Sequence, residues 1–272
     1  MKSIAVQSVA IAAVLAVGSS SVAGRQAHSH PAQPPAPAKP GAAADPQKSK
    51  PKGAKPNRPK PENQPGAVMD AAKLAASHAD HHEMEVLEGG GVLPEGWRHR
   101  FDLPSMKLEH LRFLKDGNSL HITSGPPGIV YDPSITAAGQ YVVRGTFSQL
   151  AKGEHREGYG PFIGGADLDG ESQRYLYFLV RQDGRFLVKQ RTGVNTRGVV
   201  DWTPHAAIKS FGKDGAMTNE LAIAVEKDAV RFLINGTEVA RTPRTGVETD
   251  GIVGLRVNHQ LDVRVDNLTI ER

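Results

Sequence analysis

From Trp97 onward, hydrophobic and polar residues alternate with a period of two, which is typical of β-strands. Asp183-Gly184, Asn235-Gly236 and Asp250-Gly251 can supply the positive φ angles that tight hairpins need. No stretch between these turns has the period and length of a helix, so parallel βαβ units are excluded. We predict an all-β fold, an antiparallel two-sheet β-sandwich, with strands at residues 118–123, 140–147, 174–180, 185–189, 220–226, 229–234, 252–257 and 261–270.

The predicted strand 174–180 is apolar on both faces, which is typical of a strand in the middle of a sheet. One face carries Tyr175, Tyr177 and Leu179, and the other carries Leu176 and Phe178. The length of the hairpin loop at Asp183-Gly184 decides which side chains of the next strand lie on each of these two faces. A four-residue loop would place three cationic side chains on the face of Leu176 and Phe178, namely Arg174, Lys189 and Arg191. Such a face could receive a hydroxyl-rich or acidic sugar, or be a solvent face covered by long side chains.

The first 24 residues have the three parts of a secretory signal peptide. Lys2 gives a positive start, Ile4 to Val17 is apolar, and Ser21-Val22-Ala23 offers small residues for cleavage before Gly24. The apolar run is shorter than the roughly 20 residues that span a bilayer. We therefore expect an exported protein, periplasmic, in the cell envelope or extracellular, with no transmembrane anchor after cleavage.

Residues 25–67 have the composition of a disordered Pro/Lys/Ala-rich linker. Eleven of the 19 prolines lie between Pro31 and Pro65, a pattern that favours extended polyproline II. Residues 25–70 carry eight basic and three acidic side chains, whereas residues 71–272 carry 24 basic and 26 acidic ones. The folded part is therefore slightly acidic, which argues against a nucleic-acid partner. The linker either crosses an anionic envelope layer or is a spacer without a partner.

Residues 68–91 contain a cluster of histidines in an alanine-rich segment that is expected to be a short helix or irregular. On a helix, His78 and His82 would share one face, with His81 beside them. Imidazoles at this spacing suit zinc, nickel or copper. A solvated polar segment is the competing interpretation, because short isolated helices are marginal in water. The chain has no cysteine, so thiolate metal sites and disulfides are excluded.

Several segments between residues 92 and 272 resemble a known family of exported domains. They are Tyr175–Phe186, Asp201–Pro204, Asn219–Val225, Phe232–Ala240, Gly251–Gly254 and Val265–Ile270. This succession resembles the concanavalin A-like (laminin-G/pentraxin-like) jelly roll, in particular an exported bacterial branch described as 3-keto-disaccharide hydrolase-like or of unknown function. The resemblance implies a jelly roll over residues 92–272. The family includes glycan-binding modules, glycosidases and interaction modules, so the resemblance speaks more strongly for the fold than for an activity.

A catalytic site has one weak candidate in the sequence. Asp167, Asp169 and Glu171 have the spacing of the carboxylates that a jelly-roll glucanase aims into its cleft, but the leading Glu is missing. Their glycine-rich context indicates a hairpin turn. The same run could hold calcium loosely, although it lacks the other ligands of a full calcium loop. We therefore expect no cofactor, with calcium and zinc as the open options.

The aromatic candidates for contact with a sugar are Trp97, Tyr131, Tyr159 and Trp202. Tyr159 lies between two glycines and could be exposed, whereas Trp202 has the context of a packed loop anchor. The sequence thus favours a non-catalytic module that binds a glycan or another envelope component, and the alternative is a sugar-active hydrolase. The predicted ligand-binding residues are Tyr159, Arg174, Tyr177, Lys189, Arg191 and Trp202.

Overall fold

The computed structural model describes residues 68–69 and 85–272. The predicted signal peptide, the linker to residue 67 and the three histidines of the 68–91 segment lie outside the described residues. Within the described part, no helix is long and apolar enough to cross a membrane. The helical element described there is the short 3-10 turn η1 (Leu108–His110).

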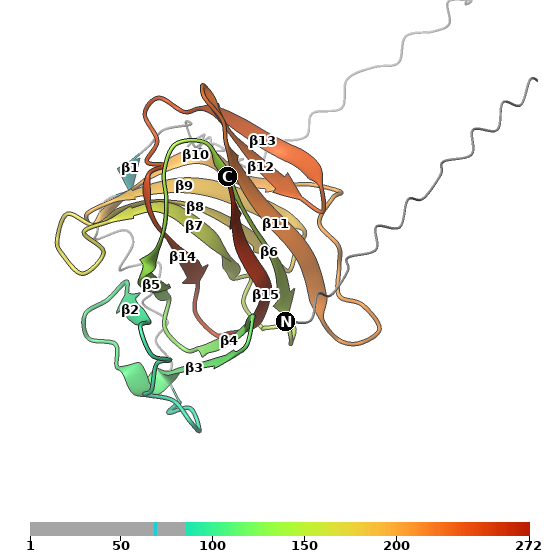
Figure 1. The fold of residues 1–272 in the computed structure, drawn as a ribbon. Coiled ribbons are helices and arrows are strands. Elements are labelled where there is room, and N and C mark those ends of the chain that lie inside the picture. The colour runs from blue at the N-terminus through green and yellow to red at the C-terminus, as the bar shows by residue number, and fades with distance from the viewer. Residues whose placement is uncertain (1–67, 70–84) are drawn as a thin grey trace, which may run out of the picture. The chain divides into compact units, whose positions relative to one another are not determined.

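The described strands form two antiparallel sheets, as predicted (Figure 1). One sheet has eight strands in the order β1 (Val68–Met69), β10 (Asn195–Pro204), β9 (Arg185–Thr192), β8 (Arg174–Arg181), β7 (Gly158–Ala166), β14 (Gly251–Val257), β5 (Gly128–Ala137) and β2 (Arg98–Phe101). The other has seven strands in the order β13 (Thr237–Pro243), β12 (Ala229–Ile234), β11 (Met217–Val225), β6 (Tyr141–Gln149), β15 (Leu261–Glu271), β4 (Ser119–Ser124) and β3 (Leu111–Asp116).

The chain passes repeatedly from one sheet to the other, which gives the jelly-roll sandwich that the sequence predicts. In Figure 1, β7 to β10 follow one another across one sheet, and β11 to β13 across the other. All the predicted strands are present, within a few residues at their ends. The structure also contains β2, β3, β5, β7, β10 and β13, which the sequence analysis did not predict. Val68 and Met69 form the two-residue strand β1 against β10, so the expectation of helical or irregular structure is wrong for them.

The main core lies between the sheets and is built from the inward residues of both. Leu176, Phe178 and Val180 of β8 belong to this core and are fully buried. The ring of Phe178 lies 5.3 Å from that of Phe232 and 6.1 Å from that of Phe186. The prediction that residues 174–180 form a mid-sheet strand is confirmed, because β8 lies between β7 and β9.

Replacing Phe178 by Ala is expected to destabilise the sandwich by about 3–5 kcal/mol, because it leaves a cavity where three aromatic rings meet. Thermal unfolding followed by circular dichroism measures this as a fall in melting temperature on the order of 10 °C. Leu114→Ala on β3 is the control, since Leu114 is 49% exposed and its loss should change stability by less than about 0.5 kcal/mol. Equal effects of the two substitutions would contradict this description of the core.

Candidate functional site

The β8–β9 hairpin decides which side chains share the outer face of the eight-stranded sheet. Arg181 pairs with Arg185, so the loop has three residues, Gln182 to Gly184. In this register Tyr177 pairs with Lys189, and Tyr175 with Arg191. The hairpin therefore does not have the four-residue loop that would have placed Lys189 and Arg191 on the face of Leu176 and Phe178. Lys189 and Arg191 lie on the face of the two tyrosines because paired residues project to the same side of a sheet.

Arg256 of β14 joins this face from across β7. Its guanidinium donates to both carboxylate oxygens of Asp102, with Nη1–Oδ1 at 3.0 Å and Nη2–Oδ2 at 2.6 Å. Nη1 also donates to the hydroxyl of Tyr175 at 3.0 Å, and the guanidinium carbon lies 5.1 Å from the centre of the Tyr177 ring. Burial by itself lowers the pKa of Arg256, but the Asp102 carboxylate raises it well above its usual value. Arg256 is therefore a permanent buried cation. We call the set Tyr175, Tyr177, Lys189, Arg191 and Arg256 the tyrosine–arginine face.

Arg191 approaches the same carboxylate from β9. Its Nη1 lies 3.8 Å from Asp102 Oδ1, too long for a hydrogen bond, while its Nε donates to the carbonyl of Gly193 at 2.7 Å. The side chains of Arg191 and Arg256 are only 4% and 6% exposed. Among the described residues, two buried guanidiniums thus approach one buried carboxylate.

Lys189 adds a third cationic side chain to the face and is only partly exposed. Burial lowers the pKa of its ammonium group, an effect that the nearby Asp201 carboxylate opposes and Arg256 reinforces. Among the described residues, three cationic side chains thus lie together on the tyrosine–arginine face, with the carboxylates of Asp102 and Asp201 nearby.

A second apolar cluster underlies this face. It contains Ile129, Tyr131, Phe162, Leu168, Tyr175, Tyr177, Leu179 and Leu187, with Trp202 and Ile252 packed against it. Ring centres are 5.1 Å apart for Phe162 and Tyr175, and 5.6 Å apart for Tyr175 and Tyr177. Position 254 must be glycine for this arrangement, because a Cβ there would lie 2.5 Å from the Phe162 ring. The aromatic groups are thus held rigidly under the charged ones.

The three carboxylates predicted as a weak catalytic candidate lie in the turn between β7 and β8. Asp167 has a φ of 49° and accepts a hydrogen bond from the backbone N–H of Ser172 at 3.0 Å. Asp169 accepts from the hydroxyl of Tyr131 at 2.5 Å and from Arg98 at 2.8 Å. Glu171 is exposed. The alternation of a strand, which would aim all three into one cleft, is therefore absent, and the interpretation as a hairpin turn is confirmed.

The chemistry of Asp169 also differs from that of a general acid. The hydrogen bond from Tyr131 lowers its pKa, burial opposes this shift, and Arg98 and Arg100 lower the pKa further. A catalytic acid needs the opposite shift, so that it holds its proton at neutral pH. Asp169 therefore acts as an anion that ties the turn to the strands β2 and β5.

The geometry of this turn argues against calcium binding, because a guanidinium already donates hydrogen bonds to the backbone oxygens that a calcium ion would use. Nη1 of Arg100 donates to the carbonyls of Leu168 at 2.9 Å and Gly170 at 2.5 Å. Arg98 holds the carboxylate of Asp169. Across residues 85–272, no group of three or more His, Asp or Glu side chains is arranged to hold a metal ion. The predicted histidine ligands His78, His81 and His82 lie outside the described residues.

The other predicted ligand-binding residues occupy different surroundings. Tyr159 is fully buried in the core between the sheets, so the expectation that it is exposed is wrong. Arg174 lies at the exposed end of β8, on the opposite side of the strand from Tyr175, and its Nε lies 3.7 Å from Glu248. Trp202 belongs to β10 rather than to a loop, and its ring centre lies 4.2 Å from the guanidinium carbon of Arg181. Of the predicted ligand-binding residues, Tyr177, Lys189 and Arg191 lie together on one face, with Trp202 packed at its edge.

Sequence reasoning missed Asp102 and Arg256, which organise the face. One signal was available for Arg256, because it is the single charged residue in the apolar strand Gly251–Val257. A charge in such a strand needs a partner or a ligand. Its partner Asp102 lies 154 residues earlier and carries no local signal.

A cleft of about 310 Å³ opens beside the tyrosine–arginine face. It is lined by β2 and the loop that follows, including His99, Arg100, Asp102 and Met106, and by Asp169 from the turn. Burial lowers the pKa of His99, and Asp169 opposes this shift. The cleft is large enough for a sugar unit.

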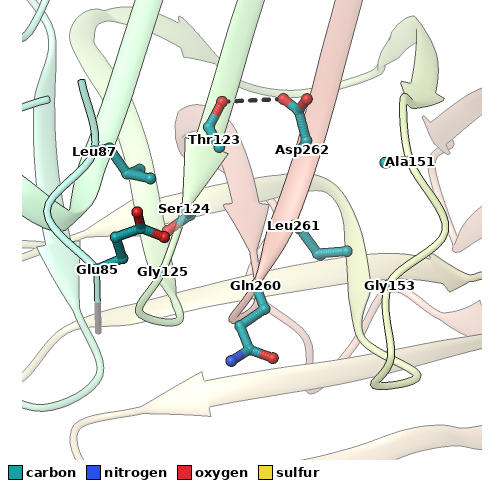
Figure 2. A pocket seen from close by; sticks show the side chains of 10 residues that line it. All are labelled: Glu85, Leu87, Thr123, Ser124, Gly125, Ala151, Gly153, Gln260, Leu261 and Asp262. Carbon is teal, nitrogen blue, oxygen red and sulfur yellow. Dashed lines mark hydrogen bonds between the residues drawn. The ribbon is translucent and has the colours of Figure 1, made fainter. Parts of the chain in front are cut away.

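A second cavity of about 370 Å³ lies where β4 ends and β15 begins (Figure 2). Its wall contains Asp262, which accepts a hydrogen bond from Thr123 at 3.0 Å and lies 2.6 Å from Nε2 of His121. Figure 2 shows Glu85 on another side of the opening, and the rest of the lining is mainly glycine, alanine and leucine. Because its main polar group is already bonded within the protein, this cavity is a poorer candidate than the tyrosine–arginine face.

No protein-family model matches the sequence, and no curated protein matches it. Among solved structures, the carbohydrate-binding module CBM66 from Bacillus subtilis is similar, with 13% identity and a TM-score of 0.48, over 65% of this chain and 96% of that one. A glycoside hydrolase family 16 endo-glucanase from Bacteroides ovatus has 10% identity and a TM-score of 0.48, over 66% and 97%. Sheep galectin-11 has 12% identity and a TM-score of 0.37, over 50% and 92%. At these scores the likenesses carry no argument about ligand or reaction.

Asp169→Asn is expected to lower the melting temperature at pH 7, because it removes the anion that Tyr131 and Arg98 hold. The folded-state pKa of Asp169 is depressed, so its stabilising effect is present above the unfolded pKa of about 4 and is lost as the pH falls through the folded pKa. The gap between wild type and variant should therefore shrink below pH 4 in thermal melts. Glu171→Gln in the same turn should leave the melt unchanged at all pH values, and a pH-independent gap for Asp169→Asn would contradict the assignment.

Proposed function

We propose that the sandwich is a non-catalytic carbohydrate-binding module and that the tyrosine–arginine face contacts the glycan. The observation that carries this proposal is the placement of Arg191, Arg256 and Lys189 beside two tyrosine rings on one sheet face. Sugars present hydroxyl groups around an apolar ring surface. Cationic N–H donors suit the hydroxyl oxygens, while Tyr175 and Tyr177, which are 1% and 5% exposed, support these donors from beneath.

The side chains of this face are held rigidly, and this supports a role in ligand binding in addition to packing. The rings of Tyr175 and Tyr177 are packed against the second apolar cluster, and the hydroxyl of Tyr175 is bonded to Arg256. Side chains held in this way lose little conformational freedom when a ligand binds. The cleft of about 310 Å³ gives a sugar unit a place against Asp102 and Arg100.

A hydrolase is the second candidate, because Asp102 and Asp169 line the same cleft. It includes the 3-keto-glycoside hydrolysis that the resemblance of the sequence implies. Against it, the pKa of Asp169 is lowered, so its carboxyl group is not prepared to donate a proton at neutral pH. The carboxylate of Asp102 is bound by Arg256 through both of its oxygens.

We also propose that the module is exported, to the periplasm, cell envelope or outside, and displayed on the spacer of residues 25–67. The support is the three-part pattern of residues 1–24 and the eleven prolines that follow. Mass spectrometry of the protein purified from its host measures the mature N-terminus. A chain that retains Met1 in the cytoplasmic fraction would contradict export.

Lys189→Gln in the full chain is expected to weaken glycan binding about 3- to 10-fold, because it removes a half-buried donor from the face. Lys209→Gln is the matched control, since Lys209 is exposed in the segment before β11. Both variants keep the basic spacer. Affinity is measured by titration calorimetry with the best ligand from a panel of neutral and acidic polysaccharides, and product release is measured by reducing-end analysis.

Failure to bind any member of the panel would refute the binding module. Product release that disappears when Asp167, Asp169 and Glu171 are all changed to amides would establish the hydrolase instead. Product release that survives the triple change would place catalysis elsewhere and remove these carboxylates from it.

A further inference from the structure

We propose that the cavity of about 370 Å³ where β4 ends and β15 begins is a separate binding site for an amino sugar. Its ligand carries a primary ammonium group on a neutral body with hydroxyl groups. The observation that carries this inference is the presence of two accessible carboxylates, Glu85 and Asp262, in a cavity whose lining contains no lysine or arginine. The cavity shares no residue with the tyrosine–arginine face, so the inference does not depend on the function proposed for that face.

The two carboxylates keep bonding capacity that suits a cation. The hydroxyl of Thr123 and Nε2 of His121 both contact Oδ1 of Asp262, at 3.0 and 2.6 Å, and no described residue bonds to Oδ2. Nδ1 of His110 lies 3.0 Å from the backbone carbonyl of Glu85, but no hydrogen bond or ion pair joins the Glu85 carboxylate to another described residue. An ammonium group offers three donors and no acceptor, so it matches these carboxylate oxygens.

A ligand can reach both carboxylates from solvent. Glu85 is exposed, and the side chain of Asp262 is 35% exposed. Figure 2 shows the two residues on different sides of the opening. An ammonium group that enters between them keeps part of its hydration and gains the attraction of two opposite charges, so its desolvation is less costly than in a closed core.

The rest of the lining suits a sugar ring better than a lysine side chain. Leu87, Ala151 and Leu261 supply apolar surface for the C–H groups of a ring. The side-chain amide of Gln260 is exposed and makes no hydrogen bond with the described part of the chain, so its donors and its acceptor can serve hydroxyl groups. A lysine side chain has no hydroxyl group for this amide. The lining therefore favours an ammonium group on a sugar.

The walls of the cavity are joined by hydrogen bonds between separate parts of the chain. The backbone N–H of Gln260 donates to the carbonyl of Gly125 at 3.0 Å. Gln182 holds Gly153, because its Nε2 donates to the carbonyl of Gly153 at 2.8 Å and its Oε1 accepts from the N–H of Gly153 at 3.1 Å. The cavity is therefore formed before a ligand enters, and little conformational freedom is lost on binding.

The test measures the affinity of the full chain for three probes by titration calorimetry. They are a trimer of glucosamine, a trimer of N-acetylglucosamine, and Nα-acetyl-lysine methylamide. The acetylated trimer keeps the rings and their hydroxyl groups but loses the charge, whereas the lysine derivative keeps the charge and loses the rings. Wild type is expected to bind the glucosamine trimer at least about 10-fold more tightly than either of the other two probes.

Two substitutions in the cavity have matched controls. Glu85→Gln is expected to weaken binding of the glucosamine trimer about 3- to 10-fold and leave the melting temperature unchanged, because it removes an exposed charge. Glu88→Gln is its control, since Glu88 is exposed and does not line the cavity. Ala151→Leu enlarges a side chain of the lining and should weaken binding at least about 10-fold. Ala138→Leu, at an exposed position between β5 and β6, should leave it unchanged.

Equal affinity of Glu85→Gln and wild type for the glucosamine trimer would overturn the inference. Equal affinity of wild type for the two trimers would overturn it as well, because the charge would then have no effect. Binding of the lysine derivative as tightly as the glucosamine trimer would overturn the choice of an amino sugar. Failure to bind any of the three probes would also refute the site, and the proposed function of the tyrosine–arginine face would still stand on its own test.

Discussion

The burial of β8 on both of its faces is the constraint on which the fold and the candidate site both depend. Its inward residues, Leu176, Phe178 and Val180, fill the core between the sheets, and this fixes the strand in the middle of the eight-stranded sheet. Its outward residues, Tyr175 and Tyr177, are then held at defined positions under the charged groups. A slip of one residue would exchange the two sets, so core packing also sets the geometry of the tyrosine–arginine face.

The same constraint explains why the fold was predictable and the site only partly. Alternation and hairpin turns are local signals, and they predicted the two-sheet architecture and the central place of β8. The sheet face on which Lys189 and Arg191 lie depends on the length of the loop Gln182–Gly184, because one residue more or less would move both side chains to the opposite face. The amino-acid composition of the loop does not determine its length. The strands that escaped prediction, such as β7 with four glycines in nine residues, are held by neighbours rather than by their own propensity.

Contacts between distant parts of the chain account for the rest of what sequence reasoning missed. Asp102 and Arg256 lie 154 residues apart, and neither position in the sequence reveals the other. For the carboxylates of residues 167–171, the spacing and the context pointed in different directions. Their spacing alone would suggest a shared cleft, whereas the glycine-rich context indicated a turn, and the backbone does turn there, with Asp167 at a φ of 49°. Spacing indicates a common face only where the strand is regular.

The distribution of charge separates specific recognition from simple attraction to polyanions. Residues 71–272 carry more acidic than basic side chains, so the folded part as a whole does not attract anions strongly. Arg191, Arg256 and Lys189 lie together at low exposure, and salt screens such groups less than it screens exposed ones. The basic side chains of residues 25–70 lie in a segment of quite different composition. Attraction by the spacer should therefore fade with added salt, while discrimination by the face persists.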